Sequence, residues 1–378
     1  MPGSRRNFLR VAGSTAVILA VGATGFALTR NPNTARRPWT EAGTYPDPMR
    51  RALSWALLAP NPHNRQPWLV EIEGEDEALL LCQLDRRLPE TDPSDRQITI
   101  GLGAFLELFR MAAAEEGFLA RIDPFPDGEA GDRLDTRPIA RIRLEPGGTP
   151  DPLFVHARDR HTNRTAYDTG RRVAESSLRA IGSATVSGVD SGFINDVDTV
   201  ASLRDLCWQA SEIEQRTPHT WQETVDLMRI GKAAINRNPD GIALPGAIPD
   251  LLRMTGVMTQ ETMSDPGSLA YQQSLDLVES WARTAMAFVW LRTDTNTRID
   301  QINAGAAYLR AALTAAGEDV AIQPMSQALQ EFPEMAGPYT EIHRRLAPEG
   351  GTVQMFARLG YARGVPLAPR WGLETRLR

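Results

Sequence analysis

Two polar clusters hold the residue types that could bind a polar cofactor. The first spans residues 59–68 and reads A-P-N-P-H-N-R-Q-P-W, between the end of a predicted helix and the start of a predicted strand. Its amides, Asn61, Asn64 and Gln66, lie among prolines, so a stiff loop presents both donors and acceptors. Such a loop could contact the polar edge of a heterocycle. The alternative is that the amides only satisfy the end of the preceding helix.

The second cluster, residues 158–164, reads R-D-R-H-T-N-R. In an extended segment alternate side chains share a face, so Arg158, Arg160, Thr162 and Arg164 could converge on one anion. A phosphate would suit three guanidinium groups and a hydroxyl. The alternative is a solvated, charged linker.

Other common catalytic patterns are missing from the sequence. It contains no H-E-x-x-H, no G-x-x-x-x-G-K-[ST] and no G-x-S-x-G. Gly101 and Gly103 are followed by leucine at position 106, so they form no dinucleotide fingerprint and indicate close helix packing instead. The histidines lack metal-site spacing, and we expect no metal.

The elements that must position the two clusters fall into two parts. Before the P-G-G-T-P linker at 146–150, the pattern predicts helices at 49–59 and 98–116, the second closed by Gly117, and strands at 68–73, 78–84, 119–122 and 139–144. After it come several helices, a Gly/Pro/Met-rich stretch at 236–263, a strand at 285–291 and a long helix at 301–316. The 236–263 stretch is either a cover over the site or a surface excursion.

An internal similarity links the two parts. A shift of 200 residues without a gap aligns identical residues in a helix–Gly–strand unit, including Gly117 with Gly317 and Pro124 with Pro324. The parts are either diverged copies or similar by coincidence. We expect a signal and linker at 1–37, a first half at 45–150 and a second half at 151–378.

Composition restricts the function classes. With 378 residues, 42% hydrophobic and 23% charged, the chain has the composition of a globular protein, and its net charge of -6 argues against nucleic acid as a partner. The two cysteines, Cys82 and Cys207, indicate no disulfide framework, although one bridge between them is possible.

The N-terminus resembles a twin-arginine (Tat) export signal. Arg5 and Arg6 immediately precede residues 11–29, a weakly hydrophobic run without charge. An ordinary membrane anchor is the alternative, and an uncleaved run would tether the protein. Removal of residues 1–37, which contain six arginines and no acid, would change the net charge from -6 to -12. The expectation is export to the periplasm or cell envelope by the Tat translocase.

Together the clusters resemble the nitroreductase family of FMN flavoproteins, and most closely its Acg-like branch, in which two nitroreductase-like halves are fused. The family carries A-P-S-x-x-N-x-Q-P-W and R-x-S-x-R segments. The resemblance covers about residues 48–374 and implies an α+β fold whose two pseudo-symmetric halves mimic the family's homodimer, so we expect a monomer.

The resemblance also implies site residues. Arg160, Thr162 and Arg164 would bind the FMN phosphate and ribityl chain, and Pro60, Asn61, Asn64 and Gln66 would line the flavin ring. The loop Pro324, Met325 and Ser326 would lie beneath flavin N5, with backbone amides polarising it, and Arg370 would complete the phosphate site. No catalytic side chain is assigned.

The sequence departs from the family pattern in ways that bear on activity. The amide loop precedes the arginine cluster, and the parts for only one flavin site are present, so one FMN per chain is expected. Ala368 and Ser326 replace a polar residue and an acid of the family. The expected function is an FMN-dependent oxidoreductase that transfers hydride through N5, with NAD(P)H as a possible donor. The alternatives are a protein that holds or stores FMN without turnover and an envelope interaction module without flavin.

Overall fold

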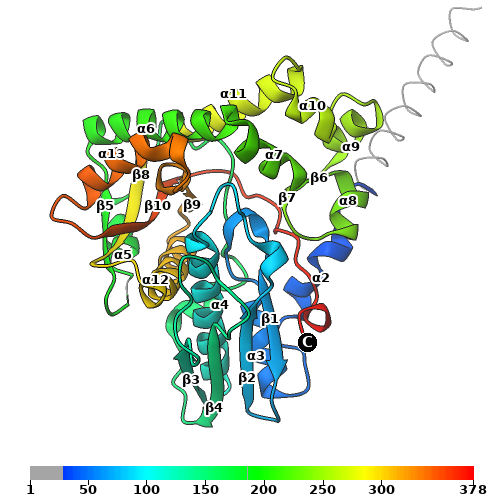
Figure 1. The fold of residues 1–378 in the computed structure, drawn as a ribbon, viewed down its shortest axis with the longest axis vertical. Coiled ribbons are helices and arrows are strands. Elements are labelled where there is room, and N and C mark those ends of the chain that lie inside the picture. Colours follow the sequence, from blue (N-terminus) through cyan, green and yellow to red (C-terminus); the bar gives the residue numbers. More distant parts are fainter. Residues whose placement is uncertain (1–28, 185) are drawn as a thin grey trace, which may run out of the picture.

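The computed structural model describes residues 29–184 and 186–378, so the expected twin-arginine signal lies outside the described residues. The chain combines helices with two four-stranded antiparallel sheets, which confirms the predicted α+β class. Figure 1 shows one sheet (β1–β4) at the lower end of the molecule, a second (β5 and β8–β10) at one upper side, and a layer of helices across the top.

The helices are α2 (Asn33–Glu41), α3 (Pro48–Ala56), α4 (Arg96–Glu115), α5 (Glu175–Gly182), α6 (Val197–Arg216), α7 (Pro218–Asp226), α8 (Gly231–Arg237), α9 (Ala247–Met254), α10 (Gln260–Ser264), α11 (Leu269–Arg283), α12 (Arg298–Gly317) and α13 (Ala336–Leu346). The strands are β1 (Trp68–Ile72), β2 (Glu77–Cys82), β3 (Phe118–Pro124), β4 (Ala140–Pro146), β5 (Asp190–Ile194), β6 (Met228–Ile230), β7 (Ile242–Leu244), β8 (Ala287–Thr293), β9 (Ala321–Pro324) and β10 (Thr352–Gly360). Each helix and strand bounded in the sequence analysis is present, with ends shifted by at most a few residues.

The two four-stranded sheets share one topology. The first has the order β1-β2-β4-β3 and the second the order β5-β8-β10-β9, and every pair in both is antiparallel. In each sheet a long helix, α4 or α12, connects the second strand in sequence to the third. This repeat of strand order and helix position agrees with the sequence similarity between the two parts.

Helices α4 and α12 pack against each other where each carries a glycine. A Cβ atom on Gly103 would lie 2.1 Å from the Ile302 carbonyl oxygen, and one on Gly305 would lie 2.0 Å from the Ile100 oxygen. Gly103 therefore serves close helix packing, as predicted. Helix α4 is long and apolar enough to cross a membrane, but most of it is buried inside the protein, which is typical of a core helix.

The reciprocal contact relates Ile100 to Ile302 and Gly103 to Gly305, an offset of 202 residues. The gapless offset of 200 instead aligns Pro124 with Pro324, the last residues of β3 and β9. It also aligns Gly117 with Gly317, but Gly117 follows α4 with a φ of 78°, whereas Gly317 is the last residue of α12. These two glycines therefore have different structural roles.

The C-terminal segment returns from the second sheet to the first, as the red chain in Figure 1 shows. Val70 of β1 donates its amide to the Arg376 carbonyl (2.9 Å) and accepts from the Arg378 amide (2.9 Å). When the chain is divided at 150/151, the C-terminal segment belongs to the second half in sequence but packs on the first half. The bridge that the sequence allowed between Cys82 and Cys207 is not formed, and both thiols are free and buried.

Candidate functional site

A cavity of about 500 Å³ lies between the two halves and is within the size range of small-molecule sites. Its walls come from the amide loop, α4, α12, the arginine cluster, the loop after β9, and the helical layer α6, α7 and α11. The predicted site residues in these walls are Pro60, Asn61, Thr162, Arg164, Pro324 and Ser326.

Arg164 is the residue most suited to binding an anion in this cavity. Its side chain is accessible and lines the cavity, and burial lowers the pKa of its guanidinium. Its guanidinium makes no hydrogen bond or ion pair with any residue in the described part of the chain. Thr162 lines the same cavity two residues earlier, as alternation in an extended segment predicts. Five donors on Arg164 remain available to a ligand.

The other arginines of the predicted phosphate site do not line the cavity. Arg160 donates to the Leu58 carbonyl (3.0 Å), and Arg370 donates to the Leu58 (3.2 Å) and Ala59 (3.1 Å) carbonyls. Burial lowers the pKa of Arg160 to about 10, and burial with the Arg160 charge lowers that of Arg370 to about 9. The expected convergence on one anion is therefore wrong for these two. The carbonyls that follow helix α3 lack helical partners, and the arginines satisfy them.

Arg158 also turns away from the cavity. It donates to the carbonyls of Trp39 and Ala42 and stacks over the Trp55 ring at 4.4 Å. The segment thus divides its residues, with Thr162 and Arg164 toward the cavity and Arg158 and Arg160 toward α2 and α3.

Only one of the three predicted amides reaches the cavity wall. Asn61 lines it. The side-chain Nδ2 of Asn61 donates to the Ala59 carbonyl (3.1 Å), and its Oδ1 accepts from the backbone N–H of Gln66 (2.7 Å). Asn64 donates to the Pro369 carbonyl and accepts from Arg370. Gln66 is fully buried. The expectation that Asn64 and Gln66 face the ring is thus wrong, because they hold the loop in place.

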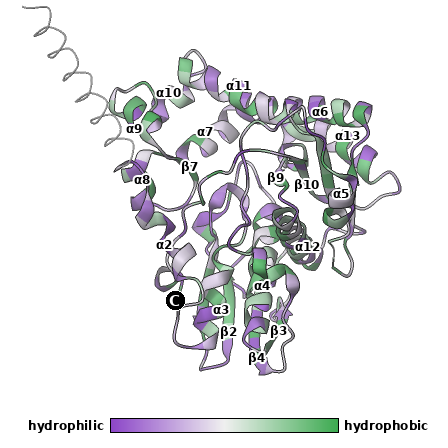
Figure 2. Cartoon of the chain, turned by 180° about the vertical axis from the view of Figure 1, so that it is seen from behind, coloured by the Kyte–Doolittle hydropathy of each residue, from purple (hydrophilic) through white to green (hydrophobic). Residues whose placement is uncertain are grey.

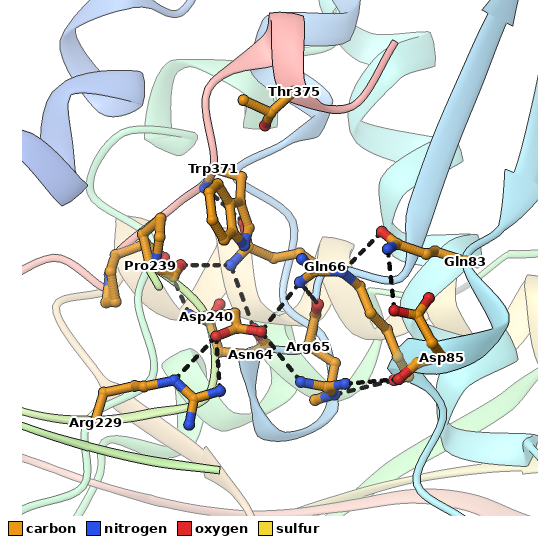
Figure 3. A network of polar contacts seen from close by, with 12 residues as sticks. Asn64, Arg65, Gln66, Gln83, Asp85, Arg229, Pro239, Asp240, Trp371 and Thr375 are labelled. Atoms are coloured by element: carbon orange, nitrogen blue, oxygen red, sulfur yellow. Dashed lines mark hydrogen bonds and ion pairs between the residues drawn. The ribbon is translucent and has the colours of Figure 1, made fainter. Parts of the chain in front are cut away.

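Figure 3 shows how the amide loop is joined to the start of the 236–263 stretch. The side chain of Gln66 donates to the Pro239 carbonyl (2.8 Å) and accepts from the Trp371 backbone amide (2.9 Å). The backbone carbonyl of Asn64 accepts from the Gly241 amide (3.2 Å). The carboxylate of Asp240 receives three guanidinium groups at 3.0–3.1 Å, which belong to Arg65, Arg86 and Arg229.

The loop carries backbone strain as well. His63, Asn64 and Gln66 all have a φ between 45° and 52°, a region that non-glycine residues seldom adopt. His63 lines the cavity, and burial with the nearby Arg164 charge lowers its pKa to about 3, so it is neutral at physiological pH. The surrounding hydrogen bonds hold this conformation, which keeps Asn61 and His63 in the wall.

The predicted segment at the end of β9 contributes two of its three residues to the wall. Pro324 and Ser326 line the cavity, and so does Gln327. Met325 is buried, and its amide donates to the Phe356 carbonyl in the neighbouring strand (2.8 Å). Because the Met325 amide bonds to β10, it is not available to polarise a ligand, contrary to expectation.

Sequence reasoning missed Glu214 of α6, a carboxyl group in the cavity wall. Its oxygens lie 3.2 Å from Gln330 Nε2 and 3.5 Å from the Thr224 hydroxyl, and it forms no ion pair with the described residues. Burial raises its pKa to about 7. A glutamate inside an amphipathic helix gives no sequence signal, since only tertiary packing places it in a cavity.

One part of the wall is apolar, and some of it belongs to the 236–263 stretch. That stretch supplies Ile242, Leu244, Met258 and Met263, and nearby helices supply Trp221, Leu277, Val278 and Trp281. It therefore covers one side of the cavity and is not a detached surface excursion. Flexible thioethers and aromatic rings suit an apolar or aromatic ligand.

Sequence comparisons relate this chain to proteins that are named as nitroreductases. A Mycobacterium tuberculosis protein provisionally named NAD(P)H nitroreductase Rv3131 is 26% identical over 319 residues, which cover 83% of this chain and 85% of that protein. The provisional NAD(P)H nitroreductase acg of the same organism is 41% identical over 81 residues, 21% of this chain and 24% of that protein. No family model matches the chain.

Among solved structures, the FMN-dependent nitroreductase NfnB from Mycobacterium smegmatis, in complex with NADPH, shares 16% identity with a TM-score of 0.33. The match covers 58% of this chain and 93% of NfnB. At that TM-score it carries no argument about this site. The support for a relationship with nitroreductases comes from the sequence relatives.

Proposed function

We propose that this chain is an FMN-dependent oxidoreductase of nitroreductase type, with FMN bound in the cavity between the two halves. The observation that carries the proposal is Arg164, which lines the cavity and whose guanidinium has no hydrogen-bond or ion-pair partner among the described residues. A cation without a counterion is costly there unless a ligand supplies the negative charge. A flavin phosphate, with nearly two negative charges, is such a ligand.

The wall residues fit FMN in kind and in place. Arg164 and the Thr162 hydroxyl would hold the phosphate, and Pro60, Asn61, Pro324 and Ser326 would surround the ring. Arg160, Arg370, Asn64 and Gln66 would act indirectly, since they fix the loops that carry those residues. When bound, FMN supplies hydride transfer through N5.

The chain's own groups would support that chemistry in two ways. The apolar wall excludes water from one side of the cavity. Burial raises the pKa of Glu214 to about 7, so part of this carboxyl group is protonated at neutral pH and could supply a proton within the same cavity. The proposed donor is NAD(P)H, by analogy with the name of the relative Rv3131. One flavin per chain is proposed because the chain has one set of site residues, and a monomer is proposed because the two halves would form a pseudo-dimer.

Purification of the protein with its native flavin tests this proposal. We expect FMN, at about one per chain, and bleaching of its visible absorbance by NAD(P)H under anaerobic conditions. FMN that NAD(P)H does not reduce would indicate a protein that holds flavin without turnover. FAD, two flavins per chain, or no affinity for added FMN would contradict the proposal.

We also propose export through the Tat translocase, supported by Arg5 and Arg6 before the uncharged run 11–29. Replacement of both arginines (Arg5→Lys, Arg6→Lys) is expected to leave the protein in the cytoplasm. Envelope fractionation measures this, and an unchanged distribution of the double variant would rule out the twin-arginine route.

A further inference from the structure

An exposed apolar stripe lies on α9, outside the cavity. Ile248, Leu251 and Met254 are 72%, 52% and 62% exposed and recur every third residue, and Val257 just beyond the helix is 44% exposed. Residues three apart share a helix face, so these side chains form one surface. Figure 2 shows hydrophobic colouring on α9, which lies at an outer edge of the molecule.

The exposed charged side chains within residues 229–257 are of one sign. Between residues 229 and 257 the acidic residues are Asp240 and Asp250, and both are buried and paired with arginines. Arg237 and Arg253 are exposed, and Lys232 is partly so. The protein as a whole is acidic, so this apolar surface with a basic rim is a local exception that complements an anionic surface.

The chain enters this same lobe from the uncharged run 11–29. Lys232 of α8 donates to the Thr29 carbonyl (2.9 Å), and Arg30 lies 3.9 Å from the Asp250 carboxylate of α9. The end of that run is therefore fixed beside α9. Its length is close to the roughly 20 residues that a membrane-spanning helix needs.

From this juxtaposition we propose that α9 docks on the membrane surface, with Ile248, Leu251, Met254 and Val257 in the interface and the basic side chains against anionic headgroups. A second copy of the chain would also cover apolar side chains, but the basic rim and the position of Thr29 favour a bilayer. The proposal is independent of the cofactor and of export by the Tat route.

A site-specific fluorescent label tests the proposal on the full chain. Both native cysteines are buried, so a polarity-sensitive maleimide dye would report on Leu251→Cys, with Val155→Cys as the control because Val155 is 73% exposed and lies on another element. With vesicles of phosphatidylcholine and phosphatidylglycerol, we expect a blue shift and quenching by brominated lipid for Leu251→Cys alone. Equal responses at both positions, or none at position 251, would overturn the proposal.

Two further variants separate the apolar stripe from the N-terminal run. In a Val257→Cys protein that retains residues 1–28, Ile248→Ser, Leu251→Ser and Met254→Ser should abolish the lipid quenching. Arg237→Glu with Arg253→Glu should weaken it several-fold in vesicles with phosphatidylglycerol. Quenching that survives the serine variant, or a label shielded in a dimer without vesicles, would also overturn the proposal.

Discussion

Gly103 of α4 and Gly305 of α12 face each other at the helix crossing, where the backbone of each helix packs directly against the glycine of the other. A Cβ on Gly305 would lie 2.0 Å from the Ile100 oxygen and 2.7 Å from the Ala104 nitrogen. Backbone atoms cannot yield as a flexible side chain can, so any side chain at position 305 must push the helices apart. The cavity between the halves depends on this close approach, since Ile100, Ala104 and Tyr308 all line it.

Gly305→Ala is therefore expected to lower the free energy of unfolding by at least about 2 kcal/mol. Gly337→Ala is the matched control, because Gly337 lies within helix α13 and a Cβ there would meet nothing within 4 Å. The control should leave stability unchanged or raise it by up to about 1 kcal/mol. Urea unfolding measures both, and equal stabilities for the two variants would contradict the tight crossing.

Asp240→Asn should destabilise the connection between the amide loop and the 236–263 stretch. Asp240 is the one carboxylate that pairs with Arg65, Arg86 and Arg229 among the described residues, and its side chain is 7% exposed. Loss of its charge leaves buried cations uncompensated, at a cost of about 3 to 5 kcal/mol. Asp190→Asn removes a solvent-exposed pair with Arg292 and should cost less than about 1 kcal/mol. Similar losses for the two variants in thermal unfolding would argue against the network.

Glu214→Gln should change the pH dependence of stability in the flavin-free protein. Burial raises the pKa of Glu214 to about 7, so the folded state binds this proton more tightly than the unfolded state, whose pKa is about 4.3. The resulting stability is complete below about pH 4 and is lost as pH rises through about 7. Relative to Glu214→Gln, the wild type should lose about 3 kcal/mol over that range.

Urea unfolding of both proteins at about pH 4 and about pH 8 measures this difference. Asp92, whose pKa burial raises to about 6, titrates in both proteins and so cancels in the comparison. Stability curves that stay parallel across the range would show that Glu214 is not held protonated in the folded protein.

Local patterns predicted much of the first half. Gly117 correctly indicated the end of α4. The apolar runs that precede and follow this helix in the sequence predicted β2 and β3. Strand β10 was not predicted, although it is a central strand. Its buried positions include Gln354 and Arg358, whose side chains bond to other buried groups, so its sequence lacks a clean apolar pattern.

The site was predicted only in part, for a physical reason. Among the residues that the motifs singled out, Pro60, Asn61, Thr162, Arg164, Pro324 and Ser326 lie in one cavity wall, and their contact with a flavin stays a prediction. Motif spacing did not predict that Arg160 and Arg370 would donate hydrogen bonds to the carbonyls after α3. Nor did it predict that the Gln66 side chain would bond to the Pro239 carbonyl and the Trp371 amide. These hydrogen-bond partners are far from the arginines and from Gln66 in the sequence, and only folding brings them close.

Titration of FMN into the flavin-free protein tests the central claim most directly, with wild type, Arg164→Ala and Arg363→Ala compared. Arg363 is an exposed arginine outside the cavity, and its side chain has no polar partner within the described residues. Loss of one charge-assisted contact should cost roughly 1.5 to 3 kcal/mol, so Arg164→Ala should bind FMN at least about tenfold more weakly while Arg363→Ala binds as the wild type does. Equal affinities for all three proteins would contradict a flavin phosphate at Arg164.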